Sequence, residues 1–218
     1  MNIIKSTGTF SFYTLISRIS GYLRDILIAI FLGSGPVADA FFVAFRIPNT
    51  FRRLFGEGSF NAAFVPSYSK ELVKGKRKSE NFANNIFNLL TIFLLALVLL
   101  VELFMPVFVS LIAPGFKSNP EKFALATQLT KITFPFILFV SLASFFSAIL
   151  NSHNRFAAAS ATPIILNLVM IGILVFGKIL GEKLAIFLSY GVSIAGFIQS
   201  VFLVLFVKKF FKPSFKIF

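Results

Sequence analysis

Four stretches of about 20 residues contain no charged side chain, and this feature restricts the possible folds more than any other. A transmembrane α-helix needs about 20 mostly apolar residues to cross roughly 30 Å of hydrocarbon. Hydrophobic residues make up 57% of the chain, which is too much for a soluble domain with a polar surface. The sequence therefore predicts an all-α fold, a polytopic bundle of membrane helices. The four stretches are 82–101, 132–152, 156–177 and 184–207.

The first 70 residues contain two further predicted crossings, in which charged residues interrupt the apolar pattern. The segment "GSGP" at 33–36 is typical of a tight turn, so its flanking segments would form a helical hairpin. Pro48 removes a backbone donor, and further Gly and Pro residues follow, so we expect the second arm to be discontinuous. The prediction is then six spans, at about 6–32, 37–69, 82–113, 123–152, 156–178 and 184–207.

Lysine and arginine are unevenly distributed over the predicted loops. With the N-terminus inside, the inside segments hold eleven of them and the outside loops four. Cytoplasmic loops carry the excess of these residues, so we expect both termini in the cytoplasm. The net charge of +13 is explained by these loops, and nucleic acid is not an expected partner. The inside residues are Lys5, Lys70, Lys74, Lys76, Arg77, Lys78, Arg155, Lys208, Lys209, Lys212 and Lys216, and the outside ones are Lys117, Lys122, Lys178 and Lys183.

The first two spans contain charged residues that a membrane helix tolerates only for a reason. A charge at mid-membrane costs about 2.5–3.5 kcal/mol, and an apolar residue returns only about 0.3–0.6 kcal/mol. These side chains should therefore face a polar cavity or partners on neighbouring helices. Two positive charges remain without an internal acidic partner, and arginine forks fit phosphate oxygens, which indicates an anionic ligand with a phosphate or pyrophosphate. The arginines are Arg18, Arg24, Arg46, Arg52 and Arg53, and the acids are Asp25, Asp39 and Glu57.

Counting residues from the predicted turn gives the depth of each arginine. Arg18 and Arg52 lie about 25 Å from the turn, and Arg24 and Arg46 about 15 Å, at about 1.5 Å per residue. The hairpin would thus present two levels of arginine. A structural role is the alternative, by pairing with acids, by bonding carbonyls near Pro48 or by reaching headgroups, and it suits Arg46 and Arg53.

Several segments of the sequence resemble the MurJ (MviN) family of bacterial lipid II flippases, in the multidrug/oligosaccharidyl-lipid/polysaccharide exporter superfamily. The resemblance covers essentially the whole chain and is most specific in the charged hairpin. Its motifs are "SRISGYLRD" (17–25), "DAFFVAFRIPNTFRRLFGEGSFNAAFVP" (39–66), "APGF" (113–116), "KFALATQLTKITFPFILFVSLASFFSAILN" (122–151) and "NRF" (154–156).

The resemblance implies transport of lipid-linked peptidoglycan precursor from the inner to the outer leaflet of the bacterial inner membrane, by alternating access between two six-helix lobes. Residues 1–218 would be the N-terminal lobe, with the C-terminal lobe absent and the chain a fragment. The resemblance further implies that Arg18, Arg24 and Arg52 line a cationic cavity for the pyrophosphate. Asp39, Ser17 and Asn49 would join them as substrate-binding residues, with Glu57, Arg46, Asp25 and Arg53 as cavity or gate candidates.

Two other classes of function stay open on the residues alone. A multidrug-type cation antiporter lobe should have acids dominating its cavity, and a membrane scaffold should carry charges on faces that meet partners. An enzyme is not expected, because no nucleophile and base can be assembled. The chain has no cysteine and one histidine, so no metal site or cofactor is expected either. We expect that histidine, His153, to be a solvated turn residue.

Overall fold

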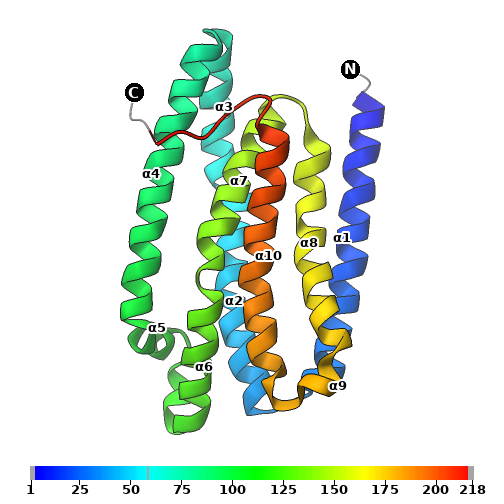
Figure 1. The fold of residues 1–218 in the computed structure, drawn as a ribbon, viewed down its shortest axis with the longest axis vertical. Helices are drawn as coiled ribbons and strands as arrows, with labels where there is room; N and C mark the ends of the chain where they lie inside the picture. Colours follow the sequence, from blue (N-terminus) through cyan, green and yellow to red (C-terminus); the bar gives the residue numbers. More distant parts are fainter. Residues whose placement is uncertain (1–2, 58, 216–218) are drawn as a thin grey trace.

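The computed structural model describes the backbone of residues 3–57 and 59–215, and the side chains of residues 8–50 and 60–215. Every regular element within these residues is a helix, and the long ones run up and down the bundle side by side (Figure 1). The elements are α1 (Ile3–Leu32), α2 (Pro36–Glu57), α3 (Ser59–Val73), α4 (Lys76–Leu103), α5 (Met105–Ile112), η1 (Pro114–Ser118), α6 (Pro120–Thr133), α7 (Phe136–Ser152), α8 (Phe156–Val175), α9 (Gly177–Leu180), η2 (Gly181–Lys183) and α10 (Leu184–Val207).

Four segments of the described chain are long and apolar enough to cross a membrane, namely Lys76–Leu103, Pro120–Ser152, Phe156–Val175 and Gly177–Val207. Each of them contains all or nearly all of one of the four uncharged stretches of the sequence. The arms formed by α1 and by α2 with α3 run beside them over a similar length (Figure 1). The architecture is therefore an all-helical membrane bundle with six arms, as the sequence predicts.

Breaks within the arms follow local sequence chemistry. In the second arm, α2 continues through Pro48 to Glu57 and α3 begins at Ser59. Residue 58 lies outside the described residues, so the expected discontinuity of this arm stays a prediction. Pro106 lies at the start of α5, where its missing N–H costs no helical hydrogen bond. The arm expected at 123–152 consists of two helices, because Pro135 stands between α6 and α7.

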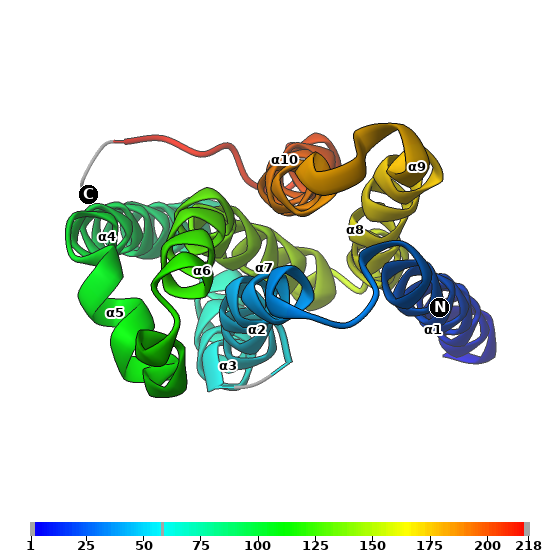
Figure 2. The ribbon, with the colours of Figure 1, turned by 90° about the horizontal axis from the view of Figure 1, so that it is seen from below.

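Helix α7 lies at the centre of the bundle and contacts α2, α3, α4, α8 and α10 (Figure 2). Polar side chains on α10 attach it to its neighbours through their backbone carbonyls: Ser200 Oγ donates to Phe139 O at 2.6 Å, and Gln199 Nε2 donates to Thr162 O at 3.0 Å. Gly196 allows close approach, because a Cβ there would lie 2.6 Å from Phe136 Cδ2. Small residues and interhelical hydrogen bonds are the usual means of packing helices in membranes.

His153 lies in a turn, as predicted, but it is half-buried and has partners, so the prediction that it is solvated is wrong. Its Nε2 lies 3.2 Å from the Tyr68 hydroxyl, and its ring stacks on Phe210 with 4.3 Å between ring centroids. Phe210 belongs to a strap, residues 208–215, which crosses from α10 to α4 at the upper end of the bundle (Figure 1). The strap buries Phe211 in an aromatic cluster with Phe87 and covers the turn that carries His153. Burial consequently lowers the pKa of His153.

Candidate functional site

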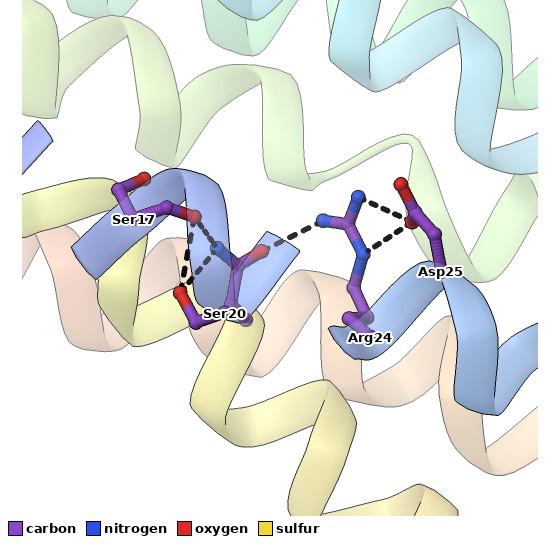
Figure 3. A network of polar contacts seen from close by, with 5 residues as sticks. Ser17, Ser20, Arg24 and Asp25 are labelled. Atoms are coloured by element: carbon purple, nitrogen blue, oxygen red, sulfur yellow. Dashed lines mark hydrogen bonds and ion pairs between the residues drawn. The ribbon is translucent and has the colours of Figure 1, made fainter. Parts of the chain in front are cut away.

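Arg24 is the centre of a polar network between α1 and α8 (Figure 3). Its Nε and Nη2 both donate to Asp25 Oδ1, at 2.9 and 2.7 Å. Its Nη1 donates to Asn167 Oδ1 at 2.8 Å, and this bond joins α1 to α8. The arginine side chain is 15% exposed, whereas that of Asp25 is 62% exposed. The network therefore places a largely shielded cation beside an accessible carboxylate.

Asn167 continues the network along α1. Its Nδ2 donates to Ser17 O at 2.9 Å and to Ser20 Oγ at 3.0 Å, and Ser20 Oγ donates to Ser17 O at 3.1 Å. Ser17 thus takes part through its backbone carbonyl. One amide side chain of α8 reaches residues on two successive turns of α1.

The helical repeat and the packing of α1 on α8 create this arrangement (Figures 1 and 2). Ser17 and Arg24 are seven residues apart, which at 3.6 residues per turn puts them on nearly the same side of α1. Between them lies Gly21, whose missing side chain leaves room for Asn167. A Cβ there would be 3.4 Å from Asn167 Nδ2, an ordinary contact, so this glycine helps the approach without being indispensable.

The guanidinium of Arg24 also lies over the ring of Phe45 in α2, with 5.4 Å from its central carbon to the ring centroid. This contact is in line with the depth count, which puts Arg24 level with the neighbouring Arg46. Of the five N–H groups of the guanidinium, three have partners among the described residues. One N–H on Nη1 and one on Nη2 have none there, and together they form a fork that can meet two oxygens of a phosphate.

Asp39 takes part in a different contact. It lies in the first turn of α2, where the helix dipole favours an acid, and Lys122 Nζ donates to its Oδ2. The same ammonium lies 4.2 Å from the ring centroid of Phe116 in η1. Six residues, or about 9 Å of helix, separate Asp39 from Phe45, so this ion pair is distinct from the Arg24 network.

The structure therefore brings together three of the predicted site residues, Ser17, Arg24 and Asp25. Arg18 and Arg46 are exposed, and Asn49 is half-buried. The remaining candidates, Arg52, Arg53 and Glu57, lie outside the residues whose side chains the structure describes.

Sequence reasoning missed Asn167, Ser20 and the role of Lys122, which counted only as a loop lysine. A signal for Asn167 was present, because it is the only amide or ionisable side chain in the uncharged stretch 156–177. A strongly polar group inside a membrane helix turns inward toward a partner.

These observations define a multi-pass helical membrane protein whose first helix holds a partly buried arginine network against α8. The family model described as "Lipid II flippase MurJ" matches residues 28–216, and the chain belongs to this family. The family resemblance found from the motifs is thereby confirmed.

Curated relatives give the same result. The chain is 40% identical over 210 residues to the probable lipid II flippase MurJ of Rickettsia prowazekii, covering 96% of this chain and 41% of that protein. It is 44% identical over 204 residues to that of Rhizobium tropici, covering 91% and 38%. A solved structure, "Lipid II flippase MurJ, inward closed conformation", superposes with a TM-score of 0.77 at 30% identity, over 95% of this chain and 43% of that one. The chain thus spans about two-fifths of the length of these relatives.

Proposed function

We propose that residues 1–218 form the N-terminal lobe of a transporter that moves lipid-linked peptidoglycan precursor from the inner to the outer leaflet of the bacterial inner membrane. A second lobe completes the alternating-access cycle. The observation that carries this proposal is Arg24, a shielded cation that keeps a fork of two N–H groups without described partners. The names of the relatives support the choice of substrate.

The pyrophosphate of the precursor binds this fork and draws on the surplus positive charge of the hairpin. A pyrophosphate carries more negative charge than the single Asp25 that faces Arg24, so it can compete for the guanidinium. Arg18 and Arg52 form the second level of the same cationic path. Ser17, Asn49 and Asp39 complete the substrate-binding set, and Glu57, Arg46, Asp25 and Arg53 act as cavity or gate residues.

A cytoplasmic N-terminus is part of the proposal, and the charge distribution of the bundle supports it. The end with the first turn of α1, the α3–α4 turn and the strap carries nine basic and two acidic described side chains, whereas the opposite end carries four and three (Figure 1). The basic end is expected in the cytoplasm. Its residues are Lys70, Lys74, Lys76, Arg77, Lys78, Arg155, Lys208, Lys209, Lys212, Glu71 and Glu80, against Lys117, Lys122, Lys178, Lys183, Asp39, Glu121 and Glu182.

A chimera tests the proposal. Residues 1–218 replace the matching region of the Rickettsia prowazekii relative, in a bacterium depleted of its own flippase. The chimera should sustain growth, and Arg24→Ala should abolish it. Arg24→Lys should rescue poorly, because an ammonium is a point charge that cannot make the forked contact. The matched control is Arg155→Ala, an exposed arginine of the α7–α8 turn, which should grow normally. Growth of a correctly inserted Arg24→Ala chimera would refute the proposed role.

The two alternative functions lack this kind of support. A cation antiporter needs an acid as its central group, but the shielded group here is an arginine and the acid beside it is exposed. A scaffold would carry its charges toward outside partners, whereas Arg24 is bonded within the bundle to α8.

A further inference from the structure

All of the described side-chain hydrogen bonds of Asn167 are to residues of α1. The residue is 5% exposed, and an amide buried without partners is costly, so the bonds to Arg24, Ser17 and Ser20 are what make the position tolerable. Its Oδ1 and its Nδ2 both have their described partners on the same neighbouring helix, α1.

The chemistry of these partners fixes the orientation of the amide. A guanidinium only donates hydrogen bonds and a backbone carbonyl only accepts them. Asn167 must therefore turn Oδ1 toward Arg24 and Nδ2 toward Ser17 O. Turning the amide over would set two donors against each other at Arg24 and two acceptors at Ser17. The direction of the guanidinium is thus coupled to the rotation of α1 against α8.

We infer that Asn167 is a positioning residue for substrate binding: it holds the Arg24 guanidinium so that the fork on Nη1 and Nη2 faces a lipid pyrophosphate. This inference rests on the function proposed above. Asn167 occupies one N–H of Nη1 while Asp25 occupies the Nε side, which leaves one N–H on each terminal nitrogen for the ligand.

A neutral amide serves this purpose where a carboxylate would not. Asparagine anchors Arg24 without cancelling its charge, whereas aspartate would give the guanidinium a second anionic partner and would set a second oxygen against Ser17 O. The shape of the side chain is the same in both cases. Asn167→Asp therefore separates the electrostatic role from simple packing.

The 218-residue chain is purified into phosphatidylcholine nanodiscs, and its affinities for undecaprenyl pyrophosphate and undecaprenyl phosphate are measured. The ratio of the two affinities should fall about tenfold in Asn167→Ala, the scale of one lost hydrogen bond to a charged group, and further in Asn167→Asp. Gln199→Ala is the matched control. Gln199 is also a buried amide that ties a helix to α8, through Thr162 O, but its described hydrogen bond involves no arginine. Its replacement should lower stability and leave the ratio within about twofold of the wild type.

The background Arg24→Ala shows through which residue Asn167 acts. Coupled residues give non-additive effects, so Asn167→Ala should change the ratio no further there. An equal loss in both backgrounds would overturn the inference, as would a wild-type ratio in Asn167→Asp, which retains the shape even if the alanine variant fails to fold. If Arg24→Ala loses the preference and both Asn167 variants keep it, only this inference fails. If the wild-type chain shows no preference for pyrophosphate, the proposed function fails as well.

Discussion

Replacing Gly196 by alanine should destabilise the bundle at the contact between α10 and α7. An alanine Cβ at this position would lie 2.6 Å from Phe136 Cδ2, 3.1 Å from Phe136 Cε2 and 3.2 Å from Phe139 Cβ. Carbon atoms normally pack about 3.5–4.0 Å apart, so the ring must move by about 1 Å. Phe136 is buried, with 1% of its surface exposed, and cannot move freely.

Two opposing effects set the size of the change. Overpacking a close contact costs about 1–3 kcal/mol, and alanine in a helix interior gains about 0.5–1 kcal/mol over glycine. Gly196→Ala should therefore lower the free energy of unfolding by up to about 2.5 kcal/mol. The matched control is Gly172→Ala in α8, because a Cβ at Gly172 meets nothing within 4 Å. That variant should be as stable as the wild type or more stable.

The assay is reversible unfolding in mixed micelles with an increasing fraction of dodecyl sulfate, followed by circular dichroism. The gain in helix propensity is common to both variants, so the difference between their unfolding free energies isolates the overpacking cost of about 1–3 kcal/mol. If Gly196→Ala unfolds at the same detergent fraction as Gly172→Ala, the close packing of α10 on Phe136 is not what this glycine provides.

Two further predictions concern the ends of the bundle. Burial lowers the pKa of His153 from its usual value near 6.5, so folding favours the neutral ring. The bundle therefore has its full stability above the pKa that His153 has in the unfolded chain, and it loses stability as the pH falls below that pKa. The free energy of unfolding, measured between about pH 8 and about pH 5, should decline in the wild type and decline less in His153→Gln. An equal decline in the two proteins would contradict the prediction. A cysteine in place of Ser34 should react with an impermeant thiol reagent outside the cell, and one in place of Lys76 should not, although both positions are exposed. The reverse labelling would reject a cytoplasmic N-terminus.

The family and the prediction of arginines inside the first two membrane helices both follow from the amino-acid sequence alone. The hairpin motif carries the family resemblance, and the cost of a charge in hydrocarbon marks the arginines of the first two helices as a set, without reference to their neighbours. The choice of Arg24 among them comes from the resemblance. Depth along a helix also follows from residue number, which is why the count puts Arg24 level with Arg46 and why Arg24 does lie over the adjacent Phe45.

The amino-acid sequence by itself determined the all-helical membrane architecture, because uncharged stretches of about 20 residues have no other way to satisfy their backbone groups in lipid. Only the tertiary structure decided which helices meet. It packs α1 on α8, supplies Asn167 to Arg24 across 143 residues of chain, joins Asp39 to Lys122, and covers His153 with the strap. Such pairings depend on how helix surfaces fit together over the whole bundle, and periodicity or charge within one segment does not contain that information.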